Sequence, residues 1–190
     1  MRAGLTKRCR EWKSSFGLIP VLFWYQQNAG WVFLAARQYD RAIQKFEEVI
    51  SKEPSSWLRL AHFLVTAYRE KGDYSKAIQV EEKAASLEGE DLDQVKAKYK
   101  DLREAYGRDG PIGYWRQQLE WSKNDENNPV GLALLYARVG DKDEAFRYLN
   151  LAFERTPIEL AGAINENAGF DSLRRDGRFQ EMLNRLGLGK

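Results

Sequence analysis

One segment occurs three times in this chain with small variations, and it constrains the fold more than any other feature. "RQYDRAIQKFEEVISKEP" (37–54) returns as "GDYSKAIQVEEKAASLEG" (72–89) and as "GDKDEAFRYLNLAFERTP" (140–157). Ala42, Ala77 and Ala145 are 35 and 68 residues apart, which is one period and two periods of about 34. A period near 34 predicts an array of helical hairpins. Because each hairpin has an apolar face that it cannot bury alone, the hairpins must stack on one another.

Local signals support helices on both sides of each short turn. "HFLVTAYREKG" has apolar residues at helical spacing and ends on Gly72, a residue typical of helix C-termini. Asp73 and Asp141 then stand where the next helix begins, and an aspartate there accepts hydrogen bonds from free backbone N–H groups. Alanine at positions 42, 77 and 145 leaves room for a partner helix to approach closely.

These residues together resemble the tetratricopeptide repeat family. The first unit matches with Ala29, Gly30, Phe33, Tyr39, Ala42, Phe46, Val49 and Pro54; the second with Leu64, Tyr68, Gly72, Tyr74, Ala77, Ala84 and Leu87; the fourth with Leu132, Ala133, Tyr136, Gly140, Ala145, Leu149, Ala152 and Pro157. The third unit is degenerate, because Trp115 stands where the family has alanine. The resemblance implies an all-α fold, a right-handed α-solenoid of helix hairpins with a C-terminal capping helix.

The predicted organisation has a partial repeat in front of the array. We expect residues 1–20 to hold the second helix of a repeat with a basic N-terminus, and residues 21–190 to form the repeat domain. Its units are expected at about 23–56, 58–91, 96–124 and 126–157, with a cap at 158–190. Leu5, Cys9, Trp12 and Phe16 follow helical spacing and lie 34 residues before Tyr39, Ile43, Phe46 and Ile50. The missing first helix would leave an unmatched apolar face, so self-association through the N-terminal end is one alternative function.

The C-terminal segment gives the most specific resemblance. "FDSLRRDGRFQEMLNRLGL" places Phe179, Met182, Leu183 and Leu186 on one helix face. It is similar to the closing segment of repeat regions attached to bacterial regulators, which carry a kinase or a DNA-binding domain in front. A second alternative is therefore a sensing or coupling module of such a regulator, separated from its effector domain.

Composition argues against catalysis, metal binding, nucleic-acid binding and membrane insertion. The net charge is +2 over 190 residues, and no global charge favours nucleic acid. The single histidine, His62, and the single cysteine, Cys9, exclude multi-histidine metal sites and internal disulfides. The apolar run "GLIPVLFWY" is too short to span a bilayer and lacks a cleavage site. We expect a non-catalytic cytoplasmic protein without cofactor or metal.

The leading hypothesis is a scaffold that binds a peptide or helix of a protein partner in a concave groove. The resemblance places the first helix of each unit along that groove. The partner-binding residues predicted from it are Trp24, Asn28, Trp31, Arg59, His62, Phe63, Thr66 and Arg69, and the fourth unit adds Leu134 and Arg138 among others. Aromatic residues beside arginine are typical of protein-binding hot spots. The competing interpretation is packing, since tryptophan at helical spacing packs in a core more often than it docks a partner.

Overall fold

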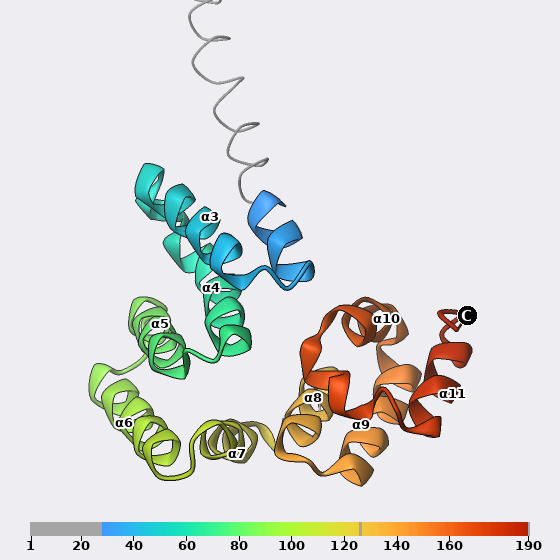
Figure 1. Cartoon of the computed structure of the whole chain (residues 1–190). Helices are drawn as coiled ribbons and strands as arrows, with labels where there is room; N and C mark the ends of the chain where they lie inside the picture. The colour runs from blue at the N-terminus through green and yellow to red at the C-terminus, as the bar shows by residue number, and fades with distance from the viewer. Residues whose placement is uncertain (1–27, 126, 190) are drawn as a thin grey trace, which may run out of the picture. The chain divides into compact units, whose positions relative to one another are not determined.

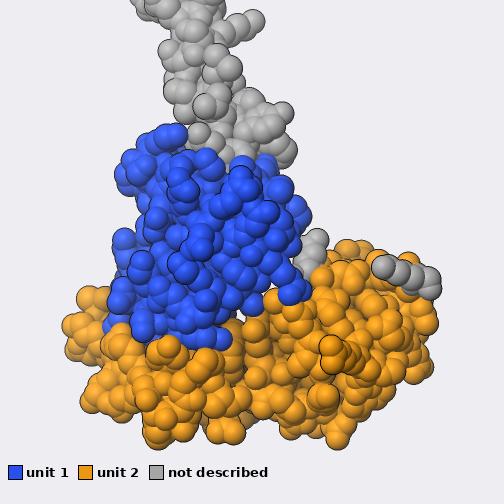
Figure 2. Space-filling model, viewed as in Figure 1, with its two compact units in different colours: residues 1–89 blue, residues 90–190 orange. Residues whose placement is uncertain are grey.

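The chain is described by a computed structural model over residues 28–125 and 127–189, and all regular structure in these ranges is helical. The fold is all-α and of the tetratricopeptide helical-repeat class, as the period predicted (Figure 1). The chain divides after Gly89 into two compact units, which Figure 2 shows in different colours. Each unit is described by itself below.

The first unit contains two helical hairpins. Residues 28–35 are helical and precede α3 (Tyr39–Lys52), and these form the first hairpin. A short 3-10 turn, η1 (Pro54–Ser56), leads into the second hairpin of α4 (Trp57–Lys71) and α5 (Tyr74–Leu87). α4 packs against both α3 and α5, so it is the central helix of this unit.

The second unit contains two further hairpins and a closing segment. The hairpins are α6 (Leu92–Asp109) with α7 (Pro111–Ser122), and α8 (Pro129–Val139) with α9 (Lys142–Arg155). The closing segment consists of α10 (Pro157–Glu166), the 3-10 helix η2 (Ala168–Leu173) and α11 (Gly177–Arg185). Within this unit α7 packs on α8, η2 packs on α8, and both α10 and α11 pack on α9.

The turns inside the second and fourth hairpins share one backbone geometry. Gly72 and Gly140 have φ of 88° and 87°, a left-handed conformation that glycine adopts without strain. Asp73 and Asp141 follow them, and their side chains accept hydrogen bonds from the backbone N–H of Lys76 and Glu144. The capping roles predicted for both aspartates are therefore confirmed. The turn before α3 has the same shape, but a non-glycine residue, Arg37, takes the left-handed position with φ of 59°.

Small residues bring the helices of the first unit together. Ala42 and Ala77 are fully buried, as the repeat predicted. Gly30 lies against the ring of Phe46, because a Cβ atom at Gly30 would be 2.4 Å from Phe46 Cε1. The apolar core of this unit therefore extends from residues 28–35 through α3 to α4, with Phe46, Val49 and Leu60 completely buried.

The third hairpin reaches close packing in another way. Trp115 replaces the expected alanine, and its side chain is only 4% exposed. The close approach of α6 and α7 is instead provided by Gly113. A Cβ atom there would lie 2.1 Å from the backbone oxygen of Ala105, so no larger residue fits.

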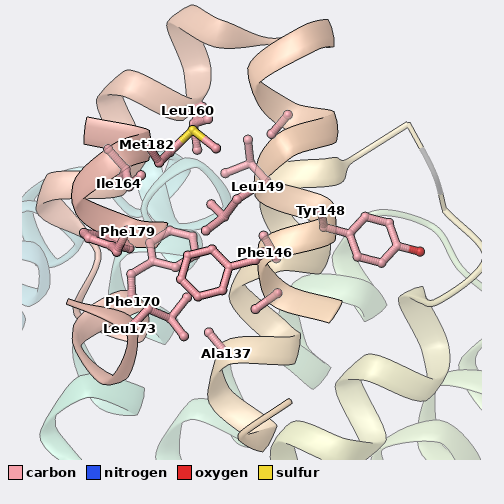
Figure 3. Packing of buried hydrophobic residues seen from close by; sticks show 14 of the residues in the cluster. Ala137, Phe146, Tyr148, Leu149, Leu160, Ile164, Phe170, Leu173, Phe179 and Met182 are labelled. Atoms are coloured by element: carbon pink, nitrogen blue, oxygen red, sulfur yellow. The ribbon is translucent and has the colours of Figure 1, made fainter. Parts of the chain in front are cut away.

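The closing segment shares one core with the fourth hairpin. Phe146 and Leu149 of α9 meet Phe170, Leu173 and Phe179 of the closing segment (Figure 3). Two side-chain hydrogen bonds join α11 to α9, and the two residues of each pair are 35 positions apart in sequence. Arg178 Nη1 donates to Asp143 Oδ1 at 2.8 Å, and Arg185 Nη1 donates to Asn150 Oδ1 at 2.9 Å.

Candidate protein-interaction surface

The predicted partner-binding residues of the second hairpin lie along one side of α4. Arg59, His62, Thr66 and Arg69 recur at intervals of three and four residues, so they share a helix face. The opposite side of α4 is apolar and buried, with Leu60, Leu64, Ala67 and Tyr68 in the core. This segregation turns the polar row outward: Arg59 and His62 are exposed, and Thr66 and Arg69 are half-buried.

Phe63 lies beside this row but belongs partly to the core. Its ring stacks on the buried ring of Phe46, with centroids 5.6 Å apart and an interplanar angle of 24°. The ring of His62 meets its edge at 5.5 Å. One side of Phe63 is therefore fixed by α3 and the half-buried remainder borders the polar row.

The surroundings of His62 disfavour the charged form of its imidazole. Desolvation by neighbouring groups, and secondly the positive charge of Arg69, lower the pKa of His62 below its usual 6.5. The backbone oxygen of His62 also accepts a hydrogen bond from Thr66 Oγ1 at 3.0 Å. The row thus places an imidazole with a lowered pKa between two arginines, Arg59 and Arg69.

Arg69 connects the row to the core of its hairpin through an ion pair. Its Nη2 donates to Glu81 Oε1 on α5, and the Glu81 side chain is only 10% exposed. Glu81 stands 35 residues after Phe46 and 68 before Leu149, both of which are fully buried. An ionic side chain therefore occupies a position that is apolar in two other hairpins. We did not predict this role from sequence, although the repeat register contains the signal.

The first hairpin contributes the exposed aromatic residue. Trp31 is 44% exposed, and Asn28 is half-buried on the same short helix. By the 35-residue offset Trp31 corresponds to Thr66 and Asn28 to Phe63, so these positions repeat on the two first helices. Among the described residues Trp31 makes no ring contact with Phe63, which stacks on Phe46 instead. The predicted residue Trp24 lies outside the described residues.

In the second unit a closing segment lies beside two residues of the predicted groove lining. Leu134 and Arg138 of α8, expected along the concave groove, are both half-buried. The backbone of Gly169 in η2 lies against both side chains, since a Cβ there would be 2.2 Å from Leu134 Cδ1 and 2.7 Å from Arg138 Nε. The reason is that η2 folds back on α8, where Phe170 and Leu173 become fully buried.

The described residues contain neither a grouped set of metal ligands nor a membrane-spanning helix. In residues 28–125 and 127–189, no three His, Cys, Asp or Glu side chains are grouped so that they would ligate a metal ion. Over the same ranges, every helix is too short or too polar to span a lipid bilayer. The α4 row and Trp31 therefore remain the candidate surface of the first unit, which is named here the α4 surface (Trp31, Arg59, His62, Phe63, Thr66 and Arg69).

Comparison with known protein families agrees with the fold. Two family models described as tetratricopeptide repeat match residues 26–56 and 54–91, which are the two hairpins of the first unit. The matches support a tetratricopeptide repeat assignment for this part of the chain. A search among curated proteins and a search among solved structures each found no significant match. Tetratricopeptide repeats generally mediate protein–protein interactions, and the matches indicate no catalytic family.

Proposed function

We propose that this chain is a non-catalytic cytoplasmic scaffold that binds a peptide or helix of a protein partner on the α4 surface, together with Trp24 and Asn28. The observation that carries this proposal is the exposed Trp31 at the same repeat position as Thr66 on the polar row. A large exposed tryptophan combined with arginine is the chemistry that protein-binding hot spots favour. Neither nucleic acid nor a membrane is expected as a partner, because the overall charge is nearly balanced.

The mechanism relies on a surface that exists before the partner arrives. α4 is fixed on two sides by α3 and α5, and its C-terminus is closed by Gly72. Helices held in this way lose little conformational entropy when a ligand binds, so more of the interaction energy appears as affinity. The partner would place an apolar side chain on Trp31 and hydrogen-bond acceptors along Arg59 and His62.

A direct test uses two substitutions that leave the core intact. The variant Trp31→Glu, His62→Glu changes two exposed side chains. Phe63 is left unchanged because its ring stacks on Phe46. The matched control is Leu87→Glu, since Leu87 is 58% exposed in the same unit.

The measurement is affinity capture from lysate of the source cells, followed by a binding titration with the purified captured protein. The expected result is a protein that binds the unaltered chain and the control but loses affinity for the double variant. Unchanged affinity of the double variant would place the interaction elsewhere and contradict the proposal.

A second candidate function is a sensing or coupling module of a bacterial regulator. It is favoured by the resemblance of the closing segment and by the way that segment ends in an amphipathic helix, α11, packed on α9. A kinase or DNA-binding reading frame beside the gene, whose product co-purifies with this chain, would support it. If the Trp31→Glu, His62→Glu variant no longer co-purifies with that product, both candidate functions use the same surface.

A further inference from the structure

The ion pair of Arg69 and Glu81 occupies two positions that are both apolar in the first and fourth hairpins. The equivalent residues are Leu34 and Phe46 in the first hairpin, and Ala137 and Leu149 in the fourth. In each of those hairpins the two residues belong to, or pack on, one core cluster. The second hairpin therefore replaces an apolar pair with two opposite charges.

Stability does not account for this replacement. An ion pair that is taken out of water loses the hydration of both charges, and apolar residues of similar volume are often equally or more stabilising. The Glu81 side chain keeps only 10% of its surface exposed, so its carboxylate bears this loss. The Arg69 side chain keeps 23% exposed. The pair thus joins a buried carboxylate to a guanidinium that still reaches the surface.

The guanidinium of Arg69 acts on the polar row of α4. Arg69 follows His62 by seven positions and Thr66 by three, so the three side chains share a helix face. The positive charge of Arg69 is felt at the imidazole, because it contributes to lowering the pKa of His62. Arg69 therefore remains a cation of the α4 surface while it is bonded to Glu81.

We infer that Glu81 is a positioning residue, which holds the guanidinium of Arg69 on the α4 surface to receive a side-chain carboxylate of the protein partner. A guanidinium carries five N–H donors in a rigid plane, and a carboxylate matches that geometry. A guanidinium that is fixed beforehand also loses less conformational freedom when the partner binds. The inference rests on the proposed function, since it names the chemistry of the partner at the same surface.

The distribution of charge favours an acidic group in the partner. Residues 28–36 and 57–69 contain no aspartate or glutamate, and the charged side chains of the α4 surface, Arg59 and Arg69, are both basic. The one acidic residue of α4, Glu70, lines a cleft in which basic residues outnumber acidic ones. The other charged residues of that cleft are Arg37, Asp40, Arg41 and Lys71. Like charges do not oppose a carboxylate that approaches Arg69 along the row.

The test uses short random peptides displayed on phage and selected on the unaltered chain. Only peptides whose binding is lost in the Trp31→Glu, His62→Glu variant are kept, because these occupy the α4 surface. We expect each to contain an aspartate or glutamate whose change to the amide weakens binding about tenfold or more. Glu81→Leu should weaken binding of the acidic peptide by a similar factor and abolish the effect of the amide, although Arg69 is still present.

Two variants separate positioning from a structural role. Glu81→Gln keeps an oxygen that accepts a hydrogen bond from Arg69, and it should restore binding of the acidic peptide. Asp40→Asn breaks an exposed ion pair with Lys71 in the same unit and should bind as the unaltered chain does. Equal binding by Glu81→Leu and the unaltered chain would contradict the inference.

A double variant decides the question if Glu81→Leu misfolds. Arg69→Met with Glu81→Leu restores an apolar pair, so its urea midpoint should be no lower than that of the unaltered chain, while its affinity for the acidic peptide falls about tenfold or more. Unchanged affinity, or selected peptides that need no acidic residue, would overturn the inference and leave the proposed function standing. Selection of no peptide that the Trp31→Glu, His62→Glu variant loses would overturn both.

Discussion

Gly113 of α7 faces the backbone carbonyl of Ala105 of α6 at a distance that no side chain fits, since a Cβ atom would lie 2.1 Å from the oxygen. The neighbour is backbone, which cannot rotate away as a side chain does. Gly113→Ala should therefore lower the free energy of unfolding by about 1–3 kcal/mol, measured by urea denaturation. Gly107→Ala is the control: Gly107 is an exposed residue of α6 with nothing near its Cβ position, and alanine there should stabilise the helix by about 0.5–1 kcal/mol. Equal effects of the two substitutions would refute the close crossing.

A glycine in the turn before α3, as in its two counterparts, should increase the stability of the first unit. Arg37 holds the left-handed conformation that Gly72 and Gly140 hold elsewhere. Relief of that backbone strain should let Arg37→Gly stabilise the first unit by about 1 kcal/mol. The measurement is thermal unfolding followed by circular dichroism. The same change at an exposed helical residue, Gln44→Gly, should destabilise by about 1 kcal/mol, and a loss of stability in both variants would show that Arg37 is not strained.

The Arg69–Glu81 ion pair should respond differently to single and double substitution. Glu81→Ala leaves Arg69 half-buried without this carboxylate and should cost about 1–3 kcal/mol of unfolding free energy. Arg69→Met with Glu81→Leu restores the apolar residue that the other hairpins carry, and this double variant should recover the loss. Urea denaturation of the three proteins provides the test. Glu120→Gln, which breaks the exposed pair with Lys123, should change stability by less than about 0.5 kcal/mol.

His62 offers a direct view of the electrostatics of the α4 surface. As the only histidine, it gives a single imidazole signal in an NMR titration. We expect its pKa to lie below 6.5 in the folded chain, chiefly through desolvation and secondly through Arg69. Arg69→Gln should raise this pKa part of the way, and Arg59→Gln, on the same face, should leave it unchanged. If Arg69→Gln leaves the pKa of His62 unchanged, Arg69 does not contribute to lowering it.

Alkaline pH should destabilise the first unit through Tyr68. Burial, and then a hydrogen bond from its hydroxyl to Glu47 Oε1 at 3.0 Å, raise the pKa of Tyr68 to about 12. Because the folded pKa lies above the usual 10, the stabilisation is complete below pH 10 and is lost as pH rises from 10 towards about 12. Urea midpoints measured between pH 9 and about 12 should fall in the unaltered chain and fall less in Tyr68→Phe. Parallel declines in both proteins would exclude Tyr68 as the cause.

The repeat period predicted most of the architecture because it encodes local rules. A glycine that ends a helix and an aspartate that starts one act over a few residues, and both signals in "GDYSKAI" and "GDKDEAF" were correct. The alanines expected at the helix crossings were also predicted correctly, since Ala42, Ala77 and Ala145 are all completely buried. These features depend on spacing alone.

The features that sequence reasoning missed depend on packing between distant segments. Alignment drew attention to Trp115 in the third hairpin, while the small residue at the helix crossing is Gly113. Nothing local in "NENAGFDSL" indicates that η2 covers Leu134 and Arg138 of α8. The charge of Glu81 is visible in the sequence, but its partner Arg69 is fixed only once α4 and α5 pack together.

The cover that η2 places on α8 has a thermodynamic consequence for the second unit. Any free peptide that bound to the sides of Leu134 and Arg138 that face Gly169 would have to displace a segment of the same chain. A tethered segment competes at an effective concentration in the millimolar range, and Phe170 and Leu173 anchor it further. Weak or scarce ligands are therefore rejected at α8 by competition, without a single repulsive contact.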